Sequence, residues 1–130
     1  MISRDDLNRI PELAKEIDSE QARVDAMRAK LYSPHGFDTK EKVQTSGSQD
    51  TLADLVIDLQ QQVDDKRSEL VGMIQLAKEL INHLKGEDRV IMLLRYVDCE
   101  SWQDISEILN YSLPTLYRRR SELLDILYEK

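Results

Sequence analysis

Apolar residues recur at spacings of three and four along most of the chain, which is the period of amphipathic helices. One seven-residue repeat comprises Ile10, Leu13, Ile17, Val24, Met27 and Leu31. A second repeat comprises Val56, Leu59, Val63, Leu70, Met73, Ala77, Leu80 and Leu84. Heptad repeats of this kind predict helices that pack along a shared seam. We find no alternation of apolar and polar residues bounded by turn residues, so we predict no β-sheet.

The first repeat predicts a long helix that reaches about Tyr32. Ser3 is a plausible N-cap, and Pro11 lies early enough to kink or delay the helix. Ser33–Gly36 contains a proline and a glycine, which stop a helix. The polar stretch that follows, to Gln49, is predicted to be a loop.

The second repeat predicts a helix that begins at a cap formed by Ser48, Asp50 or Thr51 and reaches about Lys85. Two long heptad helices with a short connection favour an antiparallel hairpin. We therefore predict an all-α fold in which residues 1–85 form a coiled-coil-like hairpin with a loop at about 33–49. Gly86 then ends the second helix or bends it into the following segment.

One polar residue interrupts each repeat, namely Glu20 in the first and Lys66 in the second. In a hairpin that closes about its loop, these two residues fall near each other. They either pair in the seam and fix its register or both extend outward to water.

Residues 86–130 are predicted to form three shorter helices. The first covers about Asp88–Asp98 and is expected to bury Val90, Leu93, Leu94 and Val97. The second covers about Trp102–Leu109, is capped by Ser101 with Asp104, and is expected to bury Trp102, Ile105, Ile108 and Leu109. Asn110-Tyr111 forms a tight turn, and Ser112 caps a third helix that contains Pro114 and is seated by Leu116. This is the spacing of a helix-turn-helix.

Three motifs in this region resemble region 4 of bacterial sigma-70-class sigma factors. They are L-L-R-Y at Leu93–Tyr96, S-W-x-D-I at Ser101–Ile105 and Y-S-x-x-T-x-Y-R at Tyr111–Arg118. The resemblance implies binding to promoter DNA and RNA polymerase. We expect a regulator and not a complete sigma factor, because the promoter-melting region of that family has no counterpart in this sequence.

The sequence departs from the sigma pattern at two positions. Asn110 stands where glycine is common, and Arg120 stands where an apolar residue is usual. Asparagine tolerates the positive φ of such a turn. Arg95 matches the arginine of the motif, and we expect it to pair with Asp104 or Glu107.

The whole layout also resembles small phage-encoded proteins of Gram-positive bacteria, which carry a V-Q-T-S-G-S segment like Val43–Ser48. This resemblance is the basis for considering the segment a binding loop. The alternative is that it is a simple connector.

The third predicted helix offers a face for base contact in the major groove. Arg118 can make a bidentate contact to guanine, and Tyr117 can pack on a thymine methyl group or reach a phosphate. Arg119 and Arg120 are better placed for phosphates. The candidate DNA-binding residues are Ser101, Gln103, Ser112, Leu113, Pro114, Thr115, Tyr117, Arg118, Arg119, Arg120 and Ser121. Alternatively, the arginines are a solvated charge run and Tyr117 is ordinary packing.

The charge balance opposes simple DNA binding. The net charge is −7, with 12 Lys/Arg against 16 Asp/Glu in residues 1–85 and 6 against 9 in residues 86–130. Both halves therefore repel a polyanion at long range. We expect weak non-specific DNA affinity and a need for a dimer or a polymerase partner.

No pattern in the sequence supports catalysis, a cofactor or a metal site. His35, His83 and Cys99 are scattered without metal-ligand spacing. The single cysteine suits a reducing cytoplasm, and no apolar run is long enough to span a membrane.

Two functions remain. The first is a phage or prophage DNA-binding transcriptional regulator that contacts RNA polymerase and forms a homodimer through residues 1–85. The second is a protein-interaction adaptor that does not bind DNA.

Overall fold

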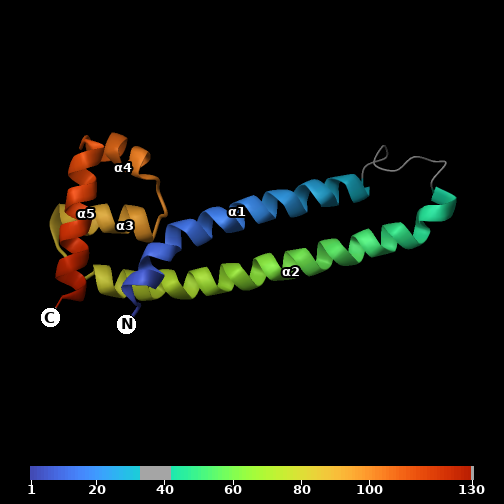
Figure 1. Cartoon of the computed structure of the whole chain (residues 1–130), viewed down its shortest axis with the longest axis horizontal. Helices are drawn as coiled ribbons and strands as arrows, with labels where there is room; N and C mark the ends of the chain where they lie inside the picture. The colour runs from blue at the N-terminus through green and yellow to red at the C-terminus, as the bar shows by residue number, and fades with distance from the viewer. Residues whose placement is uncertain (33–41, 130) are drawn as a thin grey trace. The chain divides into compact units, whose positions relative to one another are not determined.

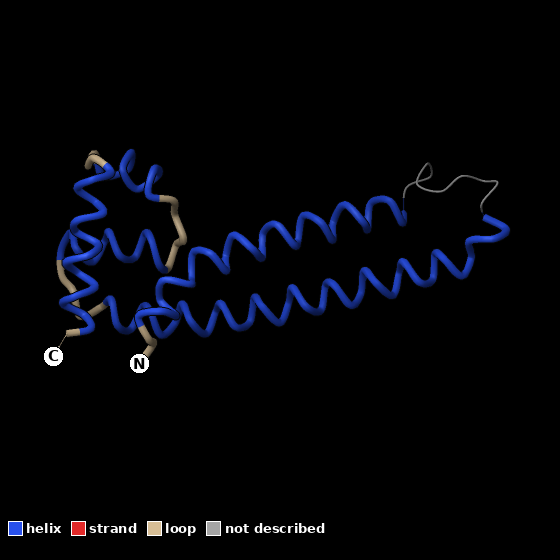
Figure 2. Tube along the Cα trace, in the orientation of Figure 1, coloured by secondary structure: helices blue, strands red, loops and turns tan. Residues whose placement is uncertain are grey.

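The computed structural model describes residues 1–32 and 42–129, with side chains described for 1–31 and 51–129. These residues form five α-helices (Figure 1): α1 (Arg4–Tyr32), α2 (Lys42–Ile81), α3 (Gly86–Tyr96), α4 (Trp102–Leu109) and α5 (Leu113–Tyr128). The described part of the chain contains no strand (Figure 2), which confirms the all-α prediction. No helix in this part is both long enough and apolar enough to cross a membrane.

Helix α1 begins as its sequence predicts. The Ser3 hydroxyl accepts a hydrogen bond of 3.1 Å from the Asp6 amide, which confirms Ser3 as the cap. Pro11 lies inside the helix and does not delay its start.

Helix α2 begins earlier than predicted. Residues 33–41 of the predicted loop lie outside the described residues, but α2 starts at Lys42, so the prediction of a loop at 42–49 is wrong. The caps predicted at Ser48, Asp50 or Thr51 are therefore also wrong. Extending an existing helix adds one backbone hydrogen bond for each residue fixed, so a long helix can continue through a polar stretch that lacks proline.

Contacts group the chain into two compact units. The first unit comprises Met1–Ala14 and Glu69–Lys130, and the second comprises Lys15–Ser68. This grouping differs from a division after residue 85. The reason is that the start of α1 and the end of α2 bury their apolar side chains together with α3 and α5.

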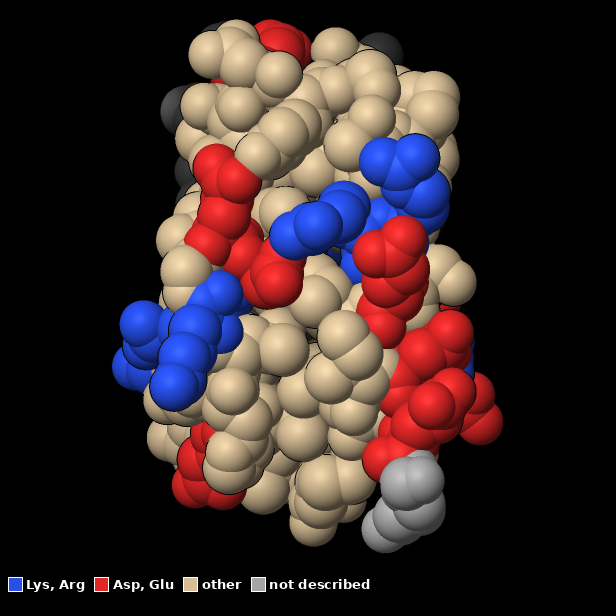
Figure 3. All heavy atoms as spheres, turned by 90° about the vertical axis from the view of Figure 1, so that its left-hand side faces the viewer, with Lys and Arg blue, Asp and Glu red and all other residues tan. Residues whose placement is uncertain are grey.

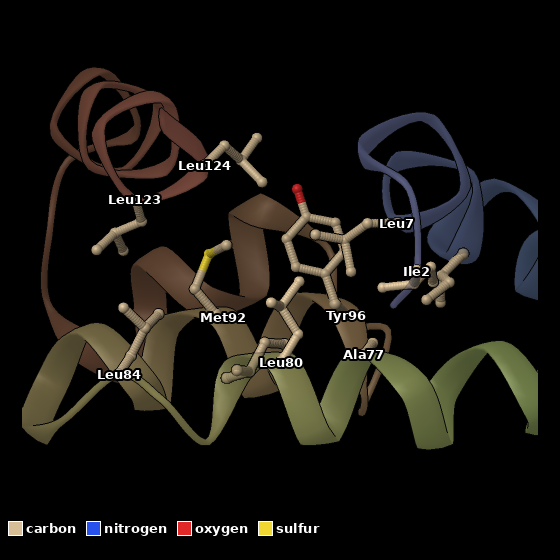
Figure 4. Close-up of a cluster of buried hydrophobic side chains, with 11 residues drawn as sticks. Ile2, Leu7, Ala77, Leu80, Leu84, Met92, Tyr96, Leu123 and Leu124 are labelled. Atoms are coloured by element: carbon tan, nitrogen blue, oxygen red, sulfur yellow. The ribbon is translucent and has the colours of Figure 1, made fainter. Parts of the chain in front are cut away.

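The larger core of the first unit surrounds Tyr96. Figure 4 shows Leu7 of α1, Leu80 of α2 and Leu124 of α5 gathered about this ring. The buried members of the cluster are Ile2, Leu7, Ile10, Ala77, Leu80, Ile81, Leu84, Met92, Tyr96, Leu123 and Leu124. Four helices therefore share one core, and the start and end of the chain both contribute to it.

A smaller core joins α3, α4 and α5 through Ile91, Ile105 and Leu116, each at most 1% exposed. Helix α3 lies between the two cores, with Ile91 in one and Met92 and Tyr96 in the other. This explains why its buried face differs from the predicted one. Val90 is 42% exposed, and Leu93, Leu94 and Val97 are only partly buried. On α4, Ile105 is buried as predicted, but Ile108 is 55% exposed.

The connection from α2 to α3 is short. Helix α2 ends at Ile81 and α3 begins at Gly86. Both positions are somewhat earlier than the predicted end of α2 at about Lys85 and the predicted start of α3 at about Asp88. Gly86 has a φ of +62°, which glycine adopts without steric cost. The chain therefore changes direction through the tight turns after Ile81 and reaches α3 at this glycine.

The second unit contains Lys15–Tyr32 of α1 and the part of α2 up to Ser68. Its buried apolar side chains are Ile17, Val24, Val56 and Val63. Gln21 and Gln60 exchange amide hydrogen bonds of 2.9 and 3.0 Å. Arg28 also donates to Gln60, at 3.1 Å. Arg28, late in α1, thus meets Gln60, whereas the earlier Glu16 meets the later Lys66, so the two segments are antiparallel.

Glu20 and Lys66 pair, as one of the two alternatives predicted. The Lys66 Nζ atom lies 2.6 Å from a Glu20 oxygen and 2.7 Å from a Glu16 oxygen. Hydrogen bonds to Glu16 and then Glu20 raise the pKa of Lys66 above its ordinary value. The Glu20 and Lys66 side chains are each 33% exposed, so the pair lies at the edge of the seam and not in its interior.

Candidate nucleic-acid interface

Local capping sets the geometry of the turn between α4 and α5. The Ser101 hydroxyl accepts from the Asp104 amide at 3.1 Å, and the Ser112 hydroxyl accepts from the Thr115 amide at 3.3 Å. Asn110 ends α4 with a φ of 61°, the left-handed conformation that its short side chain tolerates. Ser106 donates a hydrogen bond to the Tyr111 carbonyl across the turn. The caps and the turn predicted from the sequence are confirmed.

One face of α5 is buried and the other is open. Leu116, Leu123 and Leu124 are at most 3% exposed. Four predicted DNA-binding residues share the open part of the helix: Pro114, Tyr117, Arg118 and Ser121 are all exposed. The structure therefore brings these candidates together on a helix that is fixed from behind.

The three consecutive arginines have different surroundings. The Arg118 side chain is 69% exposed, and its nearest acidic partner, Glu122, lies 3.9 Å away. Arg119 forms an ion pair with Asp88 of α3. Arg120 donates to the Tyr96 hydroxyl at 3.0 Å and to the Asn8 side-chain oxygen at 2.8 Å. Among the described residues, Arg118 is the only one of the three arginines whose closest polar partner is a long ion pair, at 3.9 Å.

The remaining candidates surround the ends of α4 and α5. Ser101 and Ser112 are exposed but already act as caps, and the Gln103 amide lies 3.5 Å from Glu107. Leu113 and Thr115 are partly buried. Ser101 and Gln103 lie at the start of α4, and Ser112, Leu113 and Thr115 lie at the start of α5.

This arrangement is a helix-turn-helix whose second helix presents an open, arginine-bearing face. Residues 74–123 match the family model described as Sigma-70, region 4. The match confirms the resemblance predicted from the three motifs, and it spans the end of α2, all of α3 and α4, and most of α5. No curated protein and no solved structure matches the chain significantly.

The match supports a DNA-binding helix-turn-helix of a kind that, in sigma factors, also contacts RNA polymerase. Region 4 of sigma factors is a DNA-binding domain and not an enzyme. Within the residues described, no cluster of His, Cys, Asp and Glu could hold a metal ion. Residues 74–123 are called the region-4-like segment from here on.

Arg95 of the region-4-like segment does not pair with Asp104 or Glu107, so that prediction is wrong. Its guanidinium group donates to the Glu100 carbonyl at 3.0 Å and lies 5.0 Å from the centre of the Trp102 ring. Burial lowers the pKa of Arg95 below its ordinary value. The carbonyl and the aromatic face compensate this partly buried cation without a carboxylate.

Two residues important for the region-4-like segment were not predicted. Asn8 binds Arg120 from the first helix of the chain, and Asp88 binds Arg119 from α3. Heptad and motif spacing give no signal for either contact. The one sequence feature that pointed toward Asn8 was Arg120 itself, because an arginine in place of an apolar residue needs a polar partner.

The surface around α5 is electrically mixed. Figure 3 views the first unit from the side on which α5 lies, and it shows separate groups of basic and acidic side chains on this face, with no continuous basic field. Glu122 and Asp125 are exposed on α5 itself. The long-range attraction of this face to a polyanion is therefore small.

Proposed function

We propose that the protein is a phage or prophage transcriptional regulator whose helix α5 binds the major groove of double-stranded DNA. Pro114, Tyr117, Arg118 and Ser121 meet the bases, and Ser112 and Thr115 lie at the tip of the helix. Arg119 of α5, and Ser101 and Gln103 at the start of α4, contact phosphates. The resemblance to phage-encoded proteins supports the origin, and the match to Sigma-70 region 4 supports the DNA-binding role.

The observation that carries this proposal is the open face of α5. The helix is fixed through Leu116 and Leu124, which are almost fully buried, while Arg118 extends into solvent. A major groove admits an α-helix, and arginine pairs with the O6 and N7 atoms of guanine through two hydrogen bonds. Removing such a contact costs about 1–3 kcal/mol, or about 5- to 150-fold in affinity.

Arg119 can contact a phosphate only by exchanging its Asp88 partner, and Arg120 is held by Asn8 and Tyr96. We therefore assign the base contact to Arg118 and expect Arg120 to contribute mainly to the position of α5. Because few cations are free, binding should lose less affinity with added salt than binding by a strongly basic protein.

Selection of bound duplexes from a randomised library, followed by a gel shift, tests the DNA-binding proposal. Arg118→Ala is expected to weaken binding to the selected duplex by about 5- to 150-fold. Arg67→Ala is the matched control, because Arg67 is also exposed and paired with a carboxylate of its own helix. Failure to enrich any sequence at low salt would overturn the proposal, as would equal effects of the two substitutions.

We further propose contact with RNA polymerase and a homodimer formed through residues 1–85. The region 4 match supports the polymerase contact in general. Exposed apolar residues on α2, such as Ile57 and Val71, support a partner for this helix. Light scattering that gives a monomer mass at every concentration would rule out the dimer.

The alternative function is an adaptor that binds a protein and not DNA. Its support is the net charge of −3 in residues 86–130 together with the internal pairing of Arg119 and Arg120. A pull-down with RNA polymerase in the presence and absence of DNA distinguishes the two. Capture that is unaffected by nuclease treatment and by Arg118→Ala favours the adaptor.

A further inference from the structure

Three side chains form a stack that ends on the open face of α5. Arg95 of α3 lies over the Trp102 ring, with 5.0 Å from its guanidinium carbon to the ring centre. Trp102 meets Tyr117 edge to face, with 5.8 Å between ring centres and 82° between ring planes. The hydrogen bond from Arg95 to the Glu100 carbonyl fixes the far end of the stack.

The stack is anchored in the small core of the first unit. Trp102 packs against the cluster of Ile91, Ile105 and Leu116. Edge-to-face aromatic pairs and a cation over a tryptophan ring both favour particular orientations. The ring of Tyr117 therefore has a defined direction although 48% of the residue is exposed.

The hydroxyl of Tyr117 differs from those of the other tyrosines whose side chains are described. Tyr96 binds Asn8, Tyr111 binds Glu87, and Tyr128 binds the Ile2 carbonyl. Among the described residues, the Tyr117 hydroxyl has no such partner. An exposed ring held in place by its neighbours, with a free hydroxyl at its tip, has the properties of a contact residue.

We infer that Tyr117 is a specificity-determining residue that packs on a thymine methyl group in the major groove, and that Trp102 and Arg95 are positioning residues for its ring. This inference rests on the proposed DNA-binding function. Thymine differs from every other natural base in its C5 methyl group, which side chains read by apolar contact. A ring that is already oriented loses little conformational freedom when it meets that methyl group.

The inference predicts a particular sensitivity of the selected duplex. Replacing the contacted thymine with deoxyuridine removes one methyl group and leaves all base hydrogen bonds unchanged. We expect the affinity of the natural protein to fall by about fourfold, the value of one buried methyl-sized group. The thymine-to-uracil affinity ratio at each position of the duplex then maps the contact.

Variants separate contact from positioning. Tyr117→Ala is expected to bring the ratio to about one, whereas Tyr117→Phe keeps the ring and should keep the ratio. Arg95→Lys retains the charge but loses the planar group over Trp102, and Trp102→Leu removes the ring that orients Tyr117. Both are expected to lower the ratio toward one while leaving the loss caused by Arg118→Ala intact.

Circular dichroism identifies any variant that fails to fold. If Trp102→Leu does not fold, Arg95→Lys alone tests the positioning role. If affinity falls equally on the thymine and uracil duplexes in folded Arg95 and Trp102 variants, these residues are only structural and the positioning role is overturned. If the natural protein shows no sensitivity to uracil at any position, the methyl contact is overturned although DNA binding stands. If no duplex is bound at all, the proposed function itself fails.

Discussion

The two compact units use different means to hold helices together. In the first unit, four helices share a core in which Leu7, Tyr96 and Leu124 are almost completely buried. In the second unit, the described side chains of two helical segments include four buried apolar residues and add amide and ion-pair contacts, among them Gln21–Gln60 and Glu20–Lys66. Polar contacts at a surface contribute little net stability, whereas buried apolar area contributes much.

The difference indicates where precision is needed. Under the proposed function, α5 must hold a defined position for its open face to meet a groove, and the dense core behind it provides that position. In the second unit, the polar contacts mainly define the register of two helical segments. The first unit should therefore resist unfolding more strongly than the second.

The largest expected effect comes from matched isoleucines on α1, one in each unit. Ile10→Ala in the first unit should lower the free energy of unfolding by about 3–4 kcal/mol, and Ile17→Ala in the second unit by about 2 kcal/mol. The substitution leaves a cavity in the dense core, whereas two helices can move together and close it. Both residues are at most 3% exposed. Denaturant unfolding followed by circular dichroism and by Trp102 fluorescence, which reports on the first unit, measures both. Equal costs would contradict the difference between the units.

A smaller effect is expected at Asn8. Asn8→Ala leaves Arg120 and Tyr96 without their shared acceptor and should lower the free energy of unfolding by about 2 kcal/mol. Asn8→Asp keeps an acceptor and serves as the control. Gln21→Ala in the second unit breaks an amide pair at the edge of the seam and should cost less than about 1 kcal/mol. A greater loss from Gln21→Ala than from Asn8→Ala would reverse the comparison.

The next effect depends on pH. Burial, followed by the nearby Tyr96, raises the pKa of Tyr128 from its ordinary value of 10.0 to about 12. The folded state thus keeps a proton that the unfolded chain loses, so this stabilisation is complete below about pH 10 and disappears as the pH rises toward 12. Allowing for partial exposure, we expect the first unit to lose about 1 kcal/mol.

Trp102 fluorescence measures this loss, because Trp102 lies in the first unit. A probe of the whole chain would also report the second unit, which is weakened when Lys66 loses its charge at high pH. Tyr128→Phe should remove the part of the pH dependence that belongs to this hydroxyl. An unchanged profile in Tyr128→Phe would show that the tyrosine is not the cause.

The smallest effect is expected at Glu20. Glu20→Leu leaves Lys66 paired with Glu16, and the pair that it breaks is partly exposed, so the free energy of unfolding should change by less than about 1 kcal/mol. If the pair fixes register, two-state melting of the second unit is lost although stability changes little. A plain gain in stability with cooperative melting would contradict a register role.

Local sequence patterns predicted much of this fold. Ser101, Asn110 and Ser112 act through atoms a few residues away, so their roles could be inferred from spacing. Heptad spacing similarly placed Ile17 and Val63 in a seam. The start of α2 was predicted too late because helix propagation overrode the loop-like composition of residues 42–49.

What the sequence could not predict are the contacts between distant residues. Asn8 and Arg120 are 112 positions apart, and no periodicity joins them. Arg95 was expected to find a carboxylate, but the packing of α4 offered an aromatic ring and a carbonyl instead. The open face of α5 could be predicted from the sequence, whereas the side chains that hold it could not.

The central claim is that α5, and not the second unit, meets DNA. Its most direct test attaches an iron chelate to Ile126→Cys or to Ser68→Cys, both in a Cys99→Ser background, and maps strand cleavage on the selected duplex. Ile126 and Ser68 are both exposed, on α5 and on α2 of the second unit respectively, and neither is among the proposed contact residues. We predict cleavage confined to one site from position 126 and little from position 68. Cleavage from position 68 that equals or exceeds that from position 126, on a duplex that both proteins bind, would contradict the claim.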